Sequence, residues 1–103
     1  MIIHLKKVII DFKNINTAVI KFSASWCRPC KTISPIFSSL SDEFTNLNFY
    51  EIDVDSNQEY TKKMNVKNLP TFIVLKNGEE TERMNGSDPK KLREMIEKYS
   101  NLS

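Results

Sequence analysis

The sequence is poor in glycine, cysteine, tryptophan and histidine, with two, two, one and one of them in 103 residues. One histidine and two cysteines fall short of the roughly four ligands of a structural zinc site. No apolar run approaches the roughly 20 residues that span a membrane. Repeats, linkers and low-complexity tracts are also missing, so we expect residues 1–103 to form one domain, which is large enough to fold without disulfides.

Charge of one sign is also scarce, since 15 basic and 13 acidic side chains leave a formal net charge of +2. The signs are interspersed, so we expect neither nucleic acid nor a membrane surface as a partner. The first residues, MIIHLKKVIIDF, interrupt a short apolar run with two lysines and do not resemble a secretory signal. We expect a cytoplasmic protein, and in that compartment a close cysteine pair is more often catalytic or metal-binding than structural.

Apolar periodicity predicts strands that alternate with helices. Strands are expected at 2–5, 17–22, 47–54, 70–75 and 80–84, and helices at 27–44, 56–64 and from 89 onward. Residues 8–12 fit either a strand or a short helix. This order predicts an α/β fold with a central, mixed, five-stranded sheet (four strands as its core) and helices on both faces.

Local signals mark where several of these elements begin and turn. Ser56 and Glu59 fit a capping box that opens the second helix. Lys76-Asn77-Gly78 is typical of a tight hairpin turn. Asp88 followed by Pro89 predicts a capped start of the last helix.

Both cysteines lie in the segment SASWCRPCK, directly after an expected buried strand. Cys27 is then at the N-terminus of a helix, where unpaired amides and the helix dipole favour the reactive thiolate. Cys30 follows one turn later on the same face, so the pair could cycle between dithiol and disulfide. Pro29 stiffens the first turn at little cost. Two alternatives are small core cysteines, or a metal or iron–sulfur cluster shared by a dimer.

The segment Phe22–Lys31, FSASWCRPCK, resembles the active-site segment of the thioredoxin family. The resemblance extends along nearly the whole chain. Pro35 lies where the family kinks its active-site helix, and Asp53-Val54-Asp55 matches the end of its third strand. Leu69-Pro70-Thr71-Phe72 resembles its cis-proline loop, and Lys76-Asn77-Gly78 and Gly86 match its later turn and loop. In this order and spacing the motifs are highly specific.

The resemblance implies a thioredoxin fold and thiol–disulfide exchange that reduces protein disulfides. Cys27 would be the exposed nucleophile and Cys30 the buried cysteine that resolves the mixed disulfide. Trp26, Leu69, Pro70 (if cis) and Gly86 would bind the substrate, although Trp26 could instead fill the core. No bound cofactor would be needed, because the cysteine pair is the redox group. Thioredoxin reductase would donate electrons to a monomer, and disulfides of proteins such as peroxiredoxins would accept them.

Two positions depart from the family pattern. Arg28 replaces the usual glycine between the cysteines. Its charge would favour the Cys27 thiolate by about 1 kcal/mol or less, roughly 20 mV in potential, and would favour acidic partners. Alternatively it is only a solvated surface arginine.

Lys21 stands where the family usually carries a buried aspartate thought to help move the proton of the resolving cysteine. Glu51, expected on the neighbouring strand, lies where some members carry a lysine, so the pair would have exchanged signs. A charged Lys21 would favour the Cys30 thiolate, a neutral one could accept its proton, and a lysine reaching solvent would do neither. His4 is expected to be structural or to face solvent, and Asp55 to serve a turn and cap.

Two other functions are compatible with these residues. One is a disulfide oxidase or isomerase, although the histidine usual between the cysteines of disulfide isomerases is missing. The other is a binding module of low turnover that keeps the fold.

Overall fold

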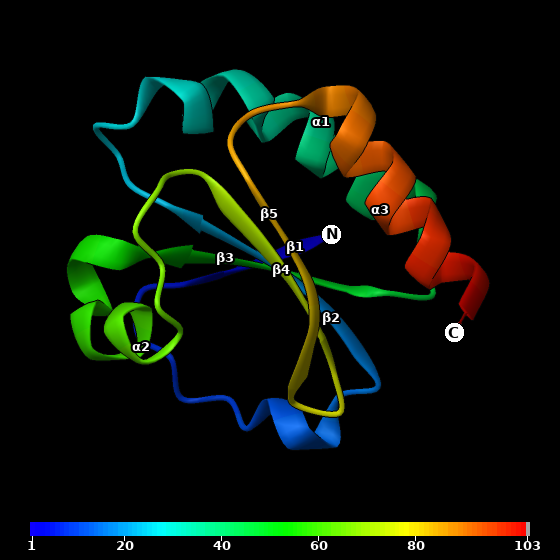
Figure 1. Cartoon of the computed structure of the whole chain (residues 1–103), viewed down its shortest axis with the longest axis horizontal. Coiled ribbons are helices and arrows are strands. Elements are labelled where there is room, and N and C mark those ends of the chain that lie inside the picture. The colour runs from blue at the N-terminus through cyan, green and yellow to red at the C-terminus, as the bar shows by residue number, and fades with distance from the viewer. Residues whose placement is uncertain (103) are drawn as a thin grey trace.

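The computed structural model describes residues 1–102 as a five-stranded sheet with helices on both faces (Figure 1). The strands are β1 (Ile2–Leu5), β2 (Thr17–Ser23), β3 (Asn48–Asp53), β4 (Thr71–Lys76) and β5 (Glu79–Asn85). The helices are α1 (Arg28–Glu43), α2 (Gln58–Lys63) and α3 (Pro89–Leu102), with short 3-10 turns at Phe12–Asn14 and Val54–Ser56. The predicted order of strands and helices is confirmed.

The sheet is mixed, as predicted, with the strand order β1-β3-β2-β4-β5. β3 runs parallel to both β1 and β2, whereas β4 is antiparallel to β2 and β5 is antiparallel to β4. β2 is therefore the central strand, and the cysteine segment leaves from its carboxyl end.

All seven residues of β2 are buried because helices cover both faces of the sheet. Val19 packs in a cluster with side chains of α1 and α3, including Ile33 and Ile96. Ile20 belongs to the cluster on the opposite face, which α2 covers. Burying an aliphatic or aromatic side chain contributes about 1.5–3 kcal/mol, so this strand is a stable base for the site. Lys21 is the one charged residue of this fully buried strand.

The predicted capping box at Ser56 is wrong. Ser56 ends a 3-10 turn, and α2 begins at Gln58 after Asn57, whose side chain does not cap the helix. Asn57 is buried and bonds instead to the end of β1 and the residues after it. Its Oδ1 accepts from the Val8 amide at 2.7 Å, and its Nδ2 donates to the Leu5 and Lys6 carbonyls. Residues 8–11 form neither a strand nor a helix, and a 3-10 turn begins at Phe12.

The other local signals are confirmed. Asn77 and Gly78 have φ angles of 51° and 85°, as a tight hairpin turn between β4 and β5 requires. A Cβ atom at Gly78 would lie 2.9–3.0 Å from atoms of Lys13, so the turn has no room for a side chain at this position. Asp88 caps α3 by accepting a hydrogen bond from the Lys91 amide at 3.1 Å. No helix within residues 1–102 is long and apolar enough to cross a membrane.

Candidate active site

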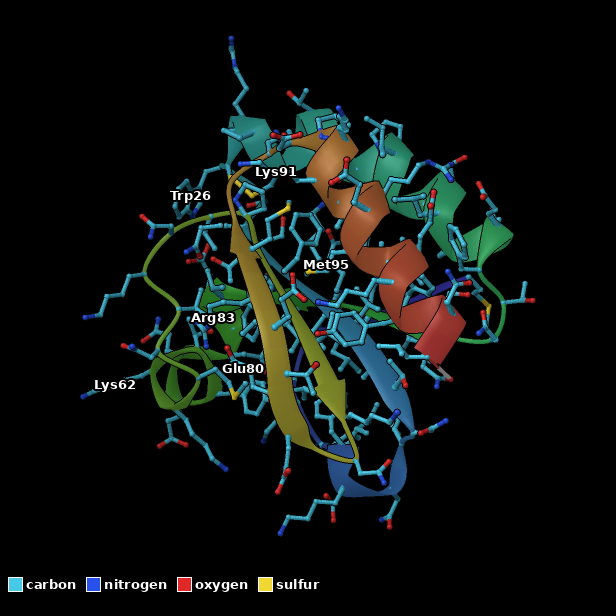
Figure 2. All side chains as sticks on the ribbon, turned by 45° about the vertical axis from the view of Figure 1, so that its right-hand side comes forward. Trp26, Lys62, Glu80, Arg83, Lys91 and Met95 are labelled. Carbon is cyan, nitrogen blue, oxygen red and sulfur yellow. A yellow bond between two sulfur atoms is a disulfide. The ribbon has the colours of Figure 1, made fainter. Side chains whose placement is uncertain are left out.

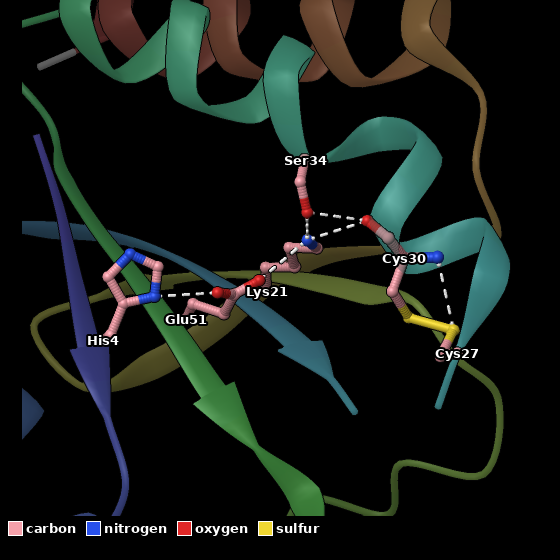
Figure 3. Close-up of polar contacts among 6 residues, drawn as sticks. All are labelled: His4, Lys21, Cys27, Cys30, Ser34 and Glu51. Carbon is pink, nitrogen blue, oxygen red and sulfur yellow. Dashed lines mark hydrogen bonds and ion pairs between the residues drawn. A yellow bond between two sulfur atoms is a disulfide. The ribbon is translucent and has the colours of Figure 1, made fainter. Parts of the chain in front are cut away.

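Cys27 and Cys30 form a disulfide at the N-terminus of α1, with their Cα atoms 5.3 Å apart (Figure 3). Cys27 is the N-cap residue, and its Sγ accepts a hydrogen bond from the Cys30 amide at 3.3 Å. A sulfur in this place faces unpaired amides and the positive end of the helix dipole, which stabilise a thiolate once the disulfide is reduced.

The expected exposure of Cys27 is wrong for this oxidised form. Only 4% of Cys27 and 1% of Cys30 is accessible to solvent. The pair packs against Ala24, Val54 and Leu69. A partner therefore reaches the sulfur through the surface immediately around it.

That surface is a groove of about 530 Å³ that Cys27 lines together with Trp26, Arg28, Pro29, Val54, Thr61, Val66, Lys67, Asn68 and Leu69. Arg28 and Pro29 are exposed in the first turn of α1. Both charged residues of the lining, Arg28 and Lys67, are cations. Of the predicted site residues, Trp26, Arg28, Pro29 and Leu69 thus come together with Cys27 in this groove.

Trp26 does not fill the core, because 68% of it is exposed and it lies at the surface in Figure 2. Its indole Nε1 donates a hydrogen bond to Asp55 Oδ2 at 2.9 Å. Asp55 lies in the 3-10 turn as the sequence predicts, but the predicted cap is wrong, because Asp53 caps this turn by accepting from the Asp55 amide. The contact of Asp55 with Trp26 is a role that the sequence did not indicate. The contact orients a flat apolar ring beside the sulfur.

The opposite wall of the groove is the segment before β4. The Leu69-Pro70 peptide bond is cis, as the family resemblance implies. Leu69 lines the groove and contacts the cysteine cluster, whereas Pro70 is buried. Gly86, with φ 96°, donates its amide hydrogen to the Pro70 carbonyl at 2.8 Å, so it supports this wall without lining the groove.

Arg83 of β5 braces the chain that leads to Leu69. Its guanidinium donates to the carbonyls of Met64 at 2.8 Å and Asn65 at 3.3 Å (Figure 2 labels Arg83). It also pairs with Glu80 at 2.6 Å, and this hydrogen bond lowers the pKa of the Glu80 carboxyl. Nothing in the sequence pattern indicated this support, because it joins segments that meet only in the folded chain.

Lys21 and Glu51 do meet, with Nζ and Oε2 2.8 Å apart. Lys21 is 1% exposed and Glu51 22%, so Lys21 does not reach solvent and that alternative is wrong. The pair follows from the parallel register of β2 and β3, in which Lys21 lies opposite Glu51. Attraction to the Glu51 carboxylate at this distance offsets part of the cost of burying the Lys21 side chain.

The surroundings of Lys21 match an ammonium group. Its Nζ lies 2.8 Å from Glu51 Oε2, 3.0 Å from the Cys30 carbonyl oxygen and 2.5 Å from Ser34 Oγ (Figure 3). Ser34 Oγ in turn donates to the Cys30 carbonyl at 2.8 Å, so it is free to accept from Lys21. Three N–H donors thus meet three acceptors, whereas a neutral amine has only two N–H bonds. Lys21 Nζ therefore donates three hydrogen bonds and has no free lone pair with which to accept a proton.

His4 also belongs to this network, although the sequence placed it apart from the cysteines. Its Nδ1 lies 2.8 Å from Glu51 Oε1, while two thirds of its side chain is exposed. Strand alternation in two parallel strands is the signal that could have found it, since His4 and Glu51 are register partners. Within residues 1–102, no group of three or more His, Cys, Asp or Glu side chains could hold a metal ion.

Comparison with known proteins agrees with this geometry. The sequence model of the thioredoxin family matches residues 5–98. Thioredoxin of Gallus gallus is 46% identical over 78 residues, which cover 76% of this chain and 74% of the relative. Thioredoxin 1 of Plasmodium falciparum is 39% identical over 82 residues, or 80% and 79% of the two chains. A solved structure of Plasmodium falciparum thioredoxin superposes with a TM-score of 0.91 at 33% identity, covering 94% of this chain and 98% of that one.

Proposed function

The chain belongs to the thioredoxin family and is a protein-disulfide reductase, and we propose that Cys27 is its nucleophile and Cys30 its resolving cysteine. The observation that carries these roles is the place of Cys27 as the N-cap of α1, in the lining of the groove, with Cys30 almost fully buried behind it. A partner's disulfide that enters the groove meets Cys27 first.

The reaction transfers two electrons from the cysteine pair to the partner. The Cys27 thiolate attacks one partner sulfur, which forms a mixed disulfide and releases the other partner sulfur as a thiolate. The Cys30 thiolate then attacks Cys27 Sγ, which forms the Cys27–Cys30 disulfide and releases the second partner sulfur. The partner is reduced and this chain is oxidised. Protons from Cys27 and Cys30 pass to solvent, from which the partner thiolates take theirs.

We propose that Lys21 assists the second step through its charge. The ammonium lies 3.0 Å from the carbonyl oxygen of Cys30, and its three hydrogens already have acceptors. It therefore stabilises the Cys30 thiolate by Coulomb attraction. Arg28, exposed at the first turn of α1, does the same for Cys27 more weakly because water screens it.

The electron donor that we propose is a thioredoxin reductase, and the acceptors are protein disulfides such as those of peroxiredoxins. We propose further that the protein acts as a monomer in the cytoplasm and needs no bound cofactor. Membership of the family supports the proposed electron donor and acceptors. The disulfide between Cys27 and Cys30 supports the proposal that no bound cofactor is needed, since this pair carries both electrons by itself.

The direct test is reduction of insulin disulfides by the protein kept reduced with dithiothreitol. We expect turnover by the wild type, none by Cys27→Ser, and an accumulating mixed disulfide with Cys30→Ser. A Lys90→Gln variant, changed on the exposed side of α3, is a matched control and should retain full activity. A Cys27→Ser variant as active as the wild type would refute the assigned roles.

The reduction potential of the pair tests the direction of transfer, and Trp26, the sole tryptophan, reports it by fluorescence in redox buffers. We expect a value near about −270 mV, as for a disulfide reductant. A value near about −180 mV or above would instead show an oxidase or isomerase. A pair with no reversible transition would leave only a binding module.

A further inference from the structure

Three ionisable side chains form a row across three neighbouring strands, each at a different depth. His4 of β1 lies opposite Glu51 of β3, which lies opposite Lys21 of β2. Glu51 uses one oxygen for each neighbour, with both contacts 2.8 Å long (Figure 3). The side chains are 66%, 22% and 1% exposed, so the row leads from solvent to the carbonyl of Cys30.

A second cavity, of about 320 Å³, lies beside this row and is lined by His4 and Glu51. Its charged lining consists of His4, Lys6, Lys31, Glu51 and Asp53, and Ser34 reaches it from α1. His4 is the only group of this lining whose side-chain type normally changes charge between pH 5 and 8. Lys6, Lys31 and Asp53 are the other charged groups that share this cavity with His4 and Glu51.

We propose that His4 is a positioning residue of the redox site, which acts on Cys30 through Glu51 and Lys21. It holds the Glu51 carboxylate in place against Lys21, and its protonation decides how strongly that carboxylate offsets the ammonium. This inference rests on the function proposed above, because it assigns a pH control to the resolving cysteine of that reaction.

The direction of the effect follows from the charges of the row. With neutral His4, Glu51 and Lys21 carry −1 and +1, and the row has no net charge. With protonated His4 the row carries +1, and Glu51 is shared between two cations. The uncompensated positive field at Cys30 is then larger, so the Cys30 thiolate is more stable. Protonated His4 therefore counteracts the loss of thiolate that acid otherwise causes.

The experiment measures the Cys30 thiolate directly, in a Cys27→Ser background, by the rate of alkylation with iodoacetamide between pH 5 and 9. Iodoacetamide is neutral, so the charge of the row does not steer it. Burial of Cys30 slows alkylation in both variants alike, so the ratio of their rates reports the ratio of their thiolate fractions. His4→Asn keeps a side-chain donor near Glu51 but removes the titration. At pH 5.5 we expect the Cys27→Ser protein to be alkylated about two- to fivefold faster than the variant that also carries His4→Asn, a difference typical of coupling between partly exposed charges. At pH 8.5 we expect the two rates to be equal.

A Lys6→Gln variant in the same background is the matched control, because it removes a charge from the same cavity without touching the row. It should leave the shape of the pH profile unchanged. A His4→Asn profile that superimposes on its parent, or lies below it by the same factor at every pH, would overturn the proposal. The second result would show a structural role alone.

Two further measurements test whether His4 acts through Glu51 and whether each variant keeps its fold. In a Glu51→Gln background the effect of His4→Asn should disappear, and its full persistence would show that His4 does not act through Glu51. Urea unfolding of each variant confirms that the fold is retained, which the exposed position of His4 on an edge strand favours. Alkylation needs no turnover, so failure of this inference is distinguishable from a protein that fails to reduce insulin.

Discussion

Replacing Lys21 by methionine is the sharpest perturbation of the site, because it removes a buried charge and keeps a similar length. The structure predicts two separate consequences. Glu51 loses its partner at 2.8 Å, and Cys30 loses the ammonium 3.0 Å from its carbonyl oxygen. The first affects stability and the second affects reactivity, so they can be measured independently.

The loss of stability should be moderate. Breaking a buried ion pair typically costs about 3–5 kcal/mol because a charge stays buried without a partner. Here Glu51 keeps His4 at 2.8 Å and is 22% exposed, so part of that cost is avoided. We expect the free energy of unfolding to fall by about 2 kcal/mol, which for a domain of this size lowers Tm by roughly 8–16 °C. Urea unfolding of the oxidised protein measures it.

The loss of reactivity should depend on pH. A cation within about 6 Å commonly changes the proton affinity of an acid by a factor of ten or more. We therefore expect roughly tenfold slower resolution of the mixed disulfide by Cys30 near neutral pH, with the difference narrowing as the thiols ionise at higher pH. Stopped-flow measurement of Trp26 fluorescence during disulfide exchange follows this step. A pH profile identical to that of the wild type would refute any role of Lys21 in the mechanism.

Three other predictions test the surroundings of the site and the ion pairs of the fold. Arg28→Gly should make the reduction potential more negative by about 20 mV or less, as measured in glutathione buffers, and a rise would contradict the proposed effect of its charge. Asp55→Ala should release the indole of Trp26, which lowers its fluorescence anisotropy and changes the free energy of unfolding by less than about 1 kcal/mol. An unchanged anisotropy would show that this hydrogen bond does not hold the ring. Lys98 lowers the pKa of Glu82 by a hydrogen bond, so the folded state favours the ionised carboxyl. This part of the stability is present above about pH 4.5 and is lost as the pH falls through the lowered pKa of Glu82. Glu82→Gln should therefore make Tm fall less steeply with acid. A Tm that depends on pH as in the wild type would exclude this contribution.

The fold could be predicted because its signals are local. Alternating apolar residues, the Asn77-Gly78 turn and the Asp88-Pro89 start each determine structure within a few residues. The cysteine pair could be placed for the same reason, since a strand, a cap and a helix follow one another directly. The misplaced capping box shows the limit of such signals. Ser56 has a suitable sequence, but Asn57 forms long-range bonds that decide where α2 begins.

The polar network around Cys30 could be predicted only in part. Lys21 and Glu51 were paired through the family resemblance, whereas Ser34 and His4 were missed. Ser34 contributes through an Oγ that faces Lys21, which depends on how α1 packs over the sheet. His4 contributes through the register of an edge strand, which depends on the order of the strands within the sheet. Strand alternation alone therefore indicates which face His4 occupies, but not that Glu51 is its partner.

The exchange of signs at Lys21 changes the way in which the site can handle a proton. A carboxylate beside the resolving cysteine can accept a proton, but the ammonium of Lys21 has all three hydrogens bonded to Glu51, Ser34 and the Cys30 carbonyl. It can therefore only lower the energy of the thiolate. The proton of Cys30 must leave by another route, and the carboxylate of this row lies one strand farther out, next to a solvent-exposed His4. Lys21, for which we propose stabilisation of the Cys30 thiolate, lies inside the sheet, whereas Glu51 and His4 lie progressively closer to solvent.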